Sequence, residues 1–410
     1  MKSIKDSVHD YIEVSGVARD LLDTPTVQRL RHVRQLGTVT LVYPSANHTR
    51  FEHSLGVYHL ATEALAHLGI EGQQAERVRA AALLHDVGHG PFSHNLEDLI
   101  HRRTGKWHDD VHGLLETGEV ARVLTDHGLN AHAVADLVAG DGKLGQLVSG
   151  ELDVDRMDYL VRDAHHTGVP YGTIDTERLV RELSFVDDEL VLAEGNVQTA
   201  ESLLVARALM TPTVYNHHTA RISKSMLRRA AERLLEESSV TGQQLRRMDD
   251  HDLVVALRDC DATAETARRL SARDLYKRGV WAEMPDVPDA LFERSHDEVR
   301  ADERAIADEA EVDPSAVILD VPSKPTMAES TSRVVVNGEV RPLGDQSTLV
   351  SALRAVQRDQ WRIGVYAPEA VAERVGHAAT RVLGLDLGGT LVSDARPGVH
   401  ATLDDFREEP

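Results

Sequence analysis

The chain has 410 residues, of which 41% are hydrophobic, so it can form two or three domains or one large helical domain with a smaller addition. The chain has a single cysteine, which excludes an internal disulfide framework. It has no apolar run long enough to span a membrane, so we expect no membrane partner. Because it also shows no signal-peptide pattern, the sequence predicts a cytoplasmic protein. The net charge of −22, with seven lysines against 38 arginines, is typical of a halophilic protein and argues against nucleic-acid binding.

The first predicted helix covers residues 25–34, with Pro25 at its first position and Asp23 or Thr24 as its cap. It is unusually basic for so acidic a chain, since it contains Arg29, Arg31 and Arg34. Either it is a solvated or salt-bridged helix, or it contacts an anion or a nucleotide.

A second helix is predicted to begin within residues 47–57 and to run to about Leu68. His53 lies near its start, three residues after Arg50. An isolated histidine would not indicate a site. His53, however, lies one helix before the next histidine cluster, and antiparallel neighbouring helices can bring their ends together. His53 is therefore a candidate ligand for a site built around the next segment.

That segment, residues 83–94, reads LLHDVGHGPFSH and follows an apolar helical run. If the helix continues, His85 and His89 are four residues apart on one face, and Asp86 adds a carboxylate. Glycines and a proline then end the helix and place His94 in a loop. The cluster suits a divalent metal with an open side. The alternative is a histidine-rich helix end whose imidazoles bond to the protein.

Two later segments add polar groups. His108 follows in the histidine-rich stretch 107–112, which is either part of a site or an exposed loop. Residues 151–166 are predicted to form a helix with one face that carries Asp155, Tyr159, Arg162 or Asp163, and His166. Such a face suits a metal beside an anionic substrate, and the alternative is a solvated face.

Residues 196–237 predict one or two long helices, kinked at Pro212, with Arg207 and Tyr215 on nearly the same face. The chain then changes character. Short helices are followed by strands at 316–321 and 361–366, a hairpin at 332–342 that turns at Asn337-Gly338, and a helix at 368–382. The predicted fold is mainly α. It comprises an all-helical body over 1–245, a smaller helical and then α+β region over 246–390, and a flexible tail over 391–410.

The chemistry follows from the ligand types. His53, His85, Asp86 and Asp155 offer mixed nitrogen and oxygen ligands, which favour Mg, Mn, Fe or Zn without distinguishing among them. His89, His94 and His108 remain as proton carriers. Basic groups for phosphate are Arg50, Arg156, Arg207 and Lys224. These residues predict metal-assisted hydrolysis of a phosphate ester or anhydride.

The order His53, His85-Asp86, Asp155 matches the H…HD…D pattern of HD-domain metal-dependent phosphohydrolases. Longer runs resemble the SAM- and HD-domain deoxynucleoside triphosphate triphosphohydrolases and their prokaryotic relatives: RFEHSLGV at 50–57, HDxGHGPFSH at 85–94 and DxDRxDYxxRDxHH at 153–166. The resemblance covers roughly residues 1–235 and includes no SAM domain. It implies a dGTPase-like homo-oligomer, a dimer or larger, that cleaves a dNTP into deoxynucleoside and triphosphate as metal-activated water attacks the α-phosphate.

The resemblance also implies residue roles. The four residues of the H…HD…D pattern would ligate the metal. His94 would be the catalytic acid/base, supported by His108 and by Glu97, which stands in place of an aspartate. The substrate contacts would be Gln35 and Arg50 at the sugar and α-phosphate, His89 and Arg207 at the phosphates, and Tyr159, Asp163 and Tyr215 at the deoxyribose and base. Arg156 replaces a lysine of the family.

A regulatory nucleotide site is a weaker implication. Asp23, Gln28 and Arg31 match the part of the family's allosteric site that reads guanine. After the strand Leu190–Leu192, however, Ala193 and Gly195 stand where basic residues are expected. Two alternatives to the triphosphohydrolase remain: another HD phosphohydrolase, such as a nucleotide phosphatase or guanosine-tetraphosphate hydrolase, and a nucleotide sensor without catalysis.

Overall fold

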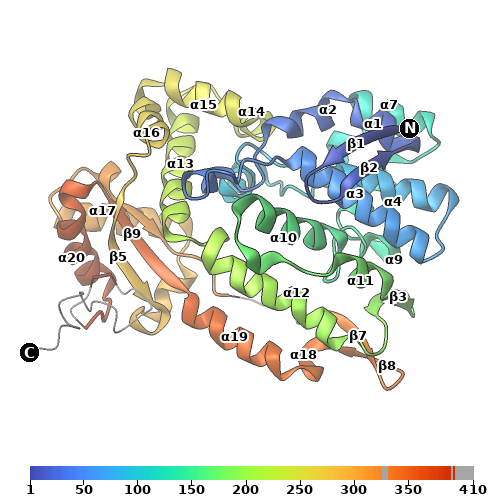
Figure 1. The fold of residues 1–410 in the computed structure, drawn as a ribbon. Coiled ribbons are helices and arrows are strands. Elements are labelled where there is room, and N and C mark those ends of the chain that lie inside the picture. Colours follow the sequence, from blue (N-terminus) through green and yellow to red (C-terminus); the bar gives the residue numbers. More distant parts are fainter. Residues whose placement is uncertain (326–330, 389–390, 393–410) are drawn as a thin grey trace, which may run out of the picture. The chain divides into compact units, whose positions relative to one another are not determined.

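The computed structural model describes residues 1–325, 331–388 and 391–392 and divides into two compact units (Figure 1). The first, here the helical unit, comprises Met1–Arg273 and Met327–Leu353. The second, the α+β unit, comprises Asp274–Thr326 and Arg354–Pro410. The predicted boundary near residue 245 stays a prediction. The predicted tail, 391–410, lies outside the described residues apart from Leu391 and Val392.

The helical unit begins with an antiparallel hairpin, β1 (Lys2–Asp6) and β2 (Asp10–Val14). Its helices are α1 (Gly16–Leu22), α2 (Pro25–Gln28), α3 (Arg50–His67), α4 (Gly72–Leu84), α5 (Glu97–Thr104), α6 (His112–Leu115), α7 (Gly118–Asp126), α8 (Ala131–Val138), α9 (Gly142–Gly145), α10 (Val154–Thr167), α11 (Thr176–Arg181), α12 (Val197–Met210), α13 (His218–Glu237), α14 (Gly242–Arg247), α15 (Asp250–Asp259) and α16 (Asp261–Ser271).

A second sheet in this unit has the strand order β3-β4-β7-β8. Its strands are β3 (Leu183–Val186), β4 (Glu189–Leu192), β7 (Arg333–Val336) and β8 (Glu339–Pro342). The predicted turn at Asn337-Gly338 joins β7 to β8, and both residues have positive φ, as a type I′ turn requires. The short helix α18 (Leu343–Gln346) follows, and α19 (Thr348–Gln360) leads on to the α+β unit.

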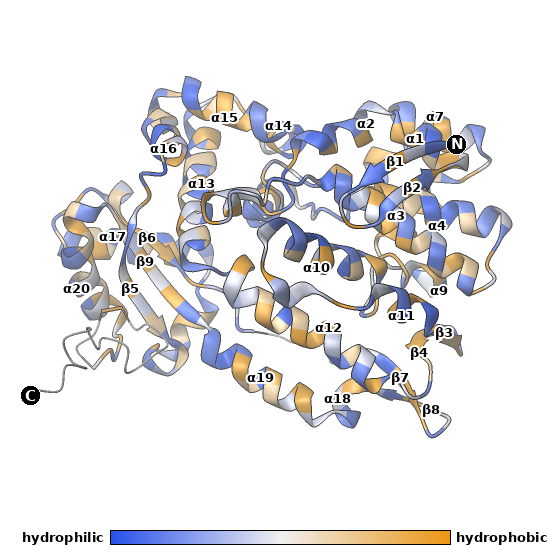
Figure 2. Ribbon diagram, viewed as in Figure 1, coloured by the Kyte–Doolittle hydropathy of each residue, from blue (hydrophilic) through white to orange (hydrophobic). Residues whose placement is uncertain are grey.

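The α+β unit is a three-stranded antiparallel sheet with helices. Its strands are β5 (Lys277–Glu283), β6 (Ile318–Asp320) and β9 (Arg362–Ala367), and its helices are α17 (His296–Glu309) and α20 (Ala372–Leu383). Surface helices of both units alternate hydrophilic and hydrophobic residues along their length, because one face packs on the core (Figure 2). The predicted mainly helical body with a smaller α+β region is therefore confirmed, although two small sheets complete the body.

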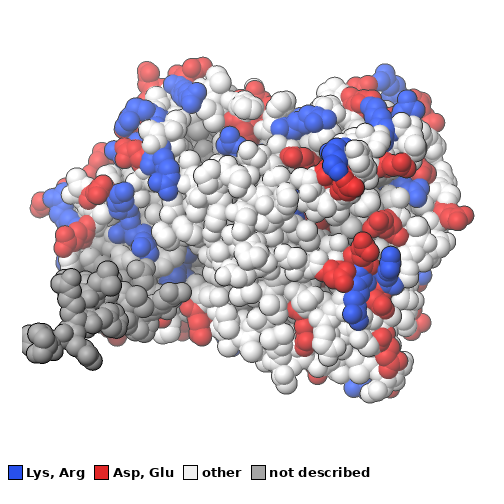
Figure 3. All heavy atoms as spheres, viewed as in Figure 1, with Lys and Arg blue, Asp and Glu red and all other residues white. Residues whose placement is uncertain are grey.

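No helix among the described residues is long and apolar enough to cross a membrane. On the face drawn in Figure 3, acidic and basic side chains are interspersed and form no continuous basic patch.

Two predicted helices are shorter than expected. Residues 25–34 form α2 and then a 3₁₀ turn, Arg29–His32. The Arg29 side chain turns inward there and donates to the carbonyls of His89, at 2.7 Å, and Met248, at 2.6 Å. Arg29 thus holds the fold together and does not face an anion.

The second correction concerns the central cluster. Helix α4 ends at Leu84, so His85 and His89 do not share a helical face. The chain instead turns through His85–Gly88, and a Cβ at Gly88 would collide with the His108 carbonyl oxygen. The loop that carries His108 therefore packs directly on this turn.

Buried charges join the first hairpin to α3 and α10. Arg162 is fully buried; it donates to Asp6 at 2.9 Å and to both carboxylate oxygens of Asp158 at 2.9 and 3.0 Å. Asp158 also bonds His9 at 2.6 Å and His53 at 2.7 Å. A side chain at Gly56 on α3 would collide with Asp158, so the glycine permits the close approach of α3 and α10.

We expect Arg162→Ala to destabilise the protein by about 3–5 kcal/mol, because it leaves the buried carboxylates of Asp6 and Asp158 without their cation. Arg181→Ala is the matched control, since Arg181 pairs with Glu177 on the exposed surface of α11 and such pairs contribute little. Urea unfolding followed by circular dichroism measures both. Equal stability of the two variants would show that the buried network does not hold the hairpin.

Candidate active site

The four residues of the H…HD…D pattern meet at one place. His53 comes from α3, His85 and Asp86 from the turn after α4, and Asp155 from α10. The Nε2 atom of His53 lies 2.8 Å from Asp155 Oδ1 and 3.3 Å from His85 Nε2. Asp86 Oδ1 lies 3.4 Å from His85 Nε2. Two nitrogen and two carboxylate ligands therefore converge.

Each imidazole is oriented by a bond on its other nitrogen. Nδ1 of His53 bonds Asp158, and Nδ1 of His85 donates to the Ala82 carbonyl at 2.8 Å. Both Nε2 atoms consequently face the centre of the cluster, as in metal sites whose histidines are held from behind.

The charges fit a cation. Burial disfavours a charged His53, yet its hydrogen bonds to Asp155 and Asp158 raise the pKa of the imidazole to about 10. Burial also opposes ionisation of Asp86, but the charges of Arg50, His85 and His89 hold its pKa well below the usual range. The cluster thus favours a positive charge beside ionised carboxylates, and the donor set suits a divalent metal.

A second group lies beside the first. Glu97, the first residue of α5, bonds Nδ1 of His94 at 2.6 Å through one oxygen and Nδ1 of His108 through the other. The His89 ring stacks on that of His108, with centroids 4.2 Å apart. Among the described residues, Nε2 of His89 is buried without a hydrogen-bond partner, and it lies 3.4 Å from Asp86 Oδ1. His89 therefore sits between the two groups.

In this second group, the pKa values of His108 and His94 are shifted in opposite directions. Burial opposes a charge on His108, but the Glu97 carboxylate raises the pKa of that imidazole. The surrounding loops desolvate His94 and lower its pKa despite the same carboxylate, although 54% of its side chain is exposed. Bonds to both histidines lower the pKa of Glu97 despite its burial. The two imidazoles are therefore shifted in opposite directions, toward the protonated form at His108 and toward the neutral form at His94.

The segment before His94 is strained. Phe92 and Ser93 adopt φ values of 57° and 54°, which non-glycine residues rarely adopt. Asp250 of α15 accepts from the Phe92 amide at 2.6 Å, and Ser93 Oγ donates to the Arg34 carbonyl at 2.6 Å. These bonds hold the backbone that positions His94.

The residues implied to bind substrate lie around the same site. The Tyr215 hydroxyl donates to Asp163 at 2.9 Å, and the Tyr159 and Tyr215 rings are 6.3 Å apart. Burial raises the pKa of Tyr159, and the nearby charges of Arg207 and Arg156 oppose this shift. Arg50, implied as a phosphate contact, donates here to both oxygens of Asp86. Within the described structure, the buried Oε1 of Gln35 lacks a hydrogen-bond partner.

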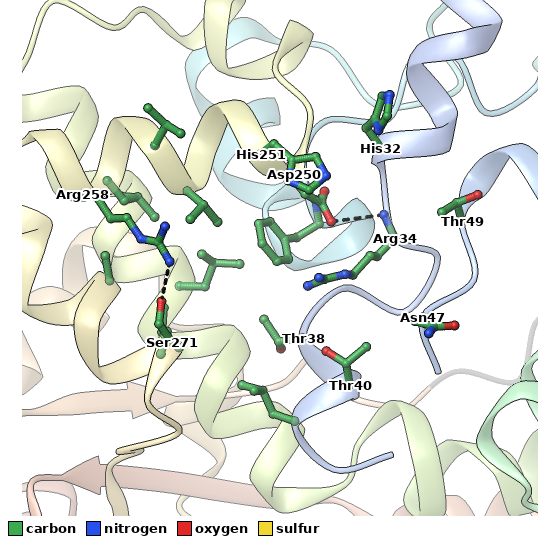
Figure 4. A pocket seen from close by; sticks show the side chains of 18 of the residues that line it. His32, Arg34, Thr38, Thr40, Asn47, Thr49, Asp250, His251, Arg258 and Ser271 are labelled. Carbon is green, nitrogen blue, oxygen red and sulfur yellow. Dashed lines mark hydrogen bonds between the residues drawn. The ribbon is translucent and has the colours of Figure 1, made fainter. Parts of the chain in front are cut away.

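The three residues implied in nucleotide control lie near α2. Arg31 donates to Gln28 at 2.8 Å and stacks its guanidinium 3.6 Å from the Phe51 ring centroid, while Asp23 pairs with Lys2. Arg31 also lines a cavity of about 720 Å³. Figure 4 shows this cavity with His32, Arg34 and Asp250 among its labelled lining residues.

The cavity shares its walls with the active-site loops. Its apolar lining comes from Leu227, Val254, Leu257, Ala267 and Leu270. Polar groups face it from the segment 31–49 and from α15, and Figure 4 shows Asp250 bonded to the Arg34 amide, at 3.2 Å. Asp250 therefore anchors both the residue before Gln35 and the strained segment before His94.

Sequence reasoning missed the residues that support the site. Asp158 orients His53, His48 bonds Asp163 at 2.8 Å, and Asp250 holds two loop amides. Only Asp158 gave a signal, since it lies three residues after Asp155 in the third motif. His48 and Asp250 carry none, because their partners are far away in sequence.

Family models match most of the chain: the HD domain matches residues 50–163, and the HD associated region matches residues 174–394. Protein MJ1154 of Methanocaldococcus jannaschii is 33% identical over 383 residues, which cover 90% of this chain and 80% of that protein. The deoxynucleoside triphosphate triphosphohydrolase SAMHD1 homolog of Dictyostelium discoideum is 31% identical over 252 residues, or 55% of this chain.

The chain spans about half the length of that Dictyostelium relative, 48%. Among solved structures, a phosphohydrolase of Bacteroides thetaiotaomicron superposes with a TM-score of 0.71 at 27% identity, covering 90% of this chain and all of that one. With an HD domain followed by the HD associated region, the chain belongs to the HD-domain family of phosphohydrolases.

Proposed function

We propose that the chain hydrolyses deoxynucleoside triphosphates to deoxynucleoside and triphosphate. The observation that carries the proposal is the arrangement of three neighbouring groups: the His/Asp cluster, the Glu97-linked histidines, and the Tyr159, Asp163 and Tyr215 set. The Dictyostelium relative, a deoxynucleoside triphosphate triphosphohydrolase SAMHD1 homolog, supports the same substrate class.

His53, His85, Asp86 and Asp155 would hold the divalent ion, which is Mg, Mn, Fe or Zn. When bound, such an ion lowers the pKa of a water and polarises a phosphoryl oxygen. Arg50, next to this cluster, would compensate charge at the α-phosphate, and His89 would contact the phosphates.

The reaction breaks the bond between the α-phosphorus and the 5′ oxygen, and the water oxygen stays on the triphosphate. The leaving 5′ oxygen needs a proton. In its imidazolium form, with Nδ1 held by Glu97, His94 would donate the proton on Nε2 to that oxygen, and the proton lost by the attacking water would balance the one transferred. His108 and Glu97 position that ring and replenish its proton.

Substrate selection would rest on the buried chain His48–Asp163–Tyr215, which holds the Tyr215 ring opposite Tyr159. The two rings would bracket the deoxyribose and base, with Arg156 and Arg207 toward the distal phosphates. Assembly into a cytoplasmic homo-oligomer completes the proposal. Asp23, Gln28 and Arg31 match only part of a regulatory nucleotide site, because Ala193 and Gly195 replace its basic residues.

We expect the purified protein, with each dNTP and Mg or Mn in high salt, to release triphosphate and deoxynucleoside. His85→Ala and Asp86→Asn should abolish release, because each removes a ligand from the cluster, whereas His127→Ala should retain it. Chromatography of the products measures this. Release of monophosphate or pyrophosphate instead would contradict the triphosphohydrolase, and binding without turnover would favour a sensor.

A second prediction concerns Glu97. Glu97→Gln should lower kcat by about 10²–10⁴-fold, because neither His94 nor His108 keeps its carboxylate. The same change should lower the pKa of His108, visible by imidazole NMR, since Glu97 is what raises it.

Glu97→Asp is the matched control, because it keeps a carboxylate of the kind usual in the family and should retain more activity than Glu97→Gln. If the Glu97→Gln variant kept the wild-type kcat, Glu97 and its two histidines would have no acid–base role in the reaction.

A further inference from the structure

A second set of metal-ligand types lies on the surface of the helical unit, apart from the active-site groups. It comprises His112 of α6, Glu116 directly after α6, and His132 and Asp136 of α8, here called the α6–α8 cluster. His112 Nε2 lies 3.0 Å from Asp136 Oδ1, and His132 Nε2 lies 3.8 Å from the same oxygen. The two imidazole rings are 4.7 Å apart.

The backbones that carry the cluster are fixed by packing. Val111 and Leu115 bury one side of α6, and Val134 and Ala135 bury one side of α8. Asn130 caps α8, because its side chain accepts from the Ala133 amide at 3.0 Å. His132 and Asp136 are one turn apart on the outer face of α8, so the helix holds these two side chains next to each other.

The distances suit a small cation with nitrogen and oxygen ligands. Tetrahedral zinc binds these ligands at about 2.0–2.1 Å, which places neighbouring ligand atoms about 3.4 Å apart. The separations of 3.0 and 3.8 Å to Asp136 bracket this value. The ligand atoms of all three residues lie within 4.8 Å of one another, so side-chain rotations can bring them around one cation.

Glu116 makes the ring of His132 ready to bind. Its carboxylate bonds His132 Nδ1 at 2.9 Å, which places a proton on that nitrogen. The lone pair of a neutral His132 is then on Nε2, which faces the Asp136 oxygen. Carboxylates hold metal-binding histidines from behind in this way and raise the basicity of the ligating nitrogen.

A proton competes with the metal ion for the Nε2 atom of His132. The hydrogen bond to Glu116, with the charge of Asp136, raises the pKa of His132. An ordinary surface ion pair has one histidine and one carboxylate and no further metal-ligand side chain beside them. His127, which bonds Asp20 at 2.8 Å, is an example. It belongs to none of the potential metal-ligand groups among the described residues. The convergence of two imidazoles on one carboxylate oxygen thus separates the cluster from a simple ion pair.

We propose that the α6–α8 cluster binds one zinc-class divalent cation through His112, His132 and Asp136, with Glu116 orienting His132. The ion would tie α6 to α8 and close the segment between them. His112 lies four residues after His108, so the tie would also restrain the loop that brings His108 to Glu97. This site is independent of the proposed reaction.

The first test counts zinc. Wild-type protein and variants are equilibrated with Zn²⁺, dialysed and measured by mass spectrometry of the metal per chain. His132→Ala and Asp136→Asn should each contain one zinc fewer than wild type, and His127→Ala should contain the wild-type number. The active-site zinc is common to all, so it cancels in the difference. Equal zinc in wild type and His132→Ala would overturn the proposal.

The second test uses affinity and stability. Glu116→Gln keeps all three ligands and should weaken zinc binding about 10–100-fold in competition with a chelator. Zinc should raise the melting temperature of His127→Ala more than that of His132→Ala, while the two variants melt alike without zinc. Wild-type affinity in Glu116→Gln, or equal zinc shifts in both variants, would count against the site.

Discussion

The buried carboxylate of Asp158 is the interaction on which the site depends. It accepts from Arg162, His9 and His53, which come from α10, the β1–β2 hairpin and α3. A buried carboxylate needs such partners, because unpaired charge is costly away from water. Satisfying Asp158 therefore draws three separate segments together, and the same bonds turn His53 toward His85 and Asp155.

Around this centre, the His53 cluster and the Glu97 group differ in the charges that they favour. The His53 cluster concentrates carboxylates and so favours a cation. The Glu97 group shifts its imidazoles in opposite directions, His108 toward the protonated form and His94 toward the neutral form. Groups with unlike pKa values at adjacent positions are typical of acid–base sites. His89 packs between them, so the geometry of one group depends on the other.

Support for the site also comes from outside the motifs. Asp250 of α15 bonds two loop amides, and through them it holds the strained backbone at Phe92 and Ser93. Strained residues persist only where surrounding contacts determine them. The α6–α8 cluster would act in the same sense on the other flank, as a restraint on the His108 loop.

The sequence by itself determined much of the fold and which residues form the group of candidate ligands. Residue type and spacing predicted His53, His85, Asp86 and Asp155 as one group, a helix over 151–166, where α10 covers Val154–Thr167, and the turn at Asn337-Gly338. These features depend on local chemistry and helical period. The family resemblance also implied Glu97 as a partner of His94. Whether these residues carry the roles implied by the resemblance stays a prediction.

Only the tertiary structure decided the rest. The helical period could not show that α4 ends before His85, because the end depends on Gly88 packing against the His108 carbonyl. It could not show that Arg29 bonds carbonyls of distant residues, nor that Asp158, Asp250 and His48 support the site. These partners lie far apart in the chain, and long-range hydrogen bonds leave no periodic trace in a single sequence.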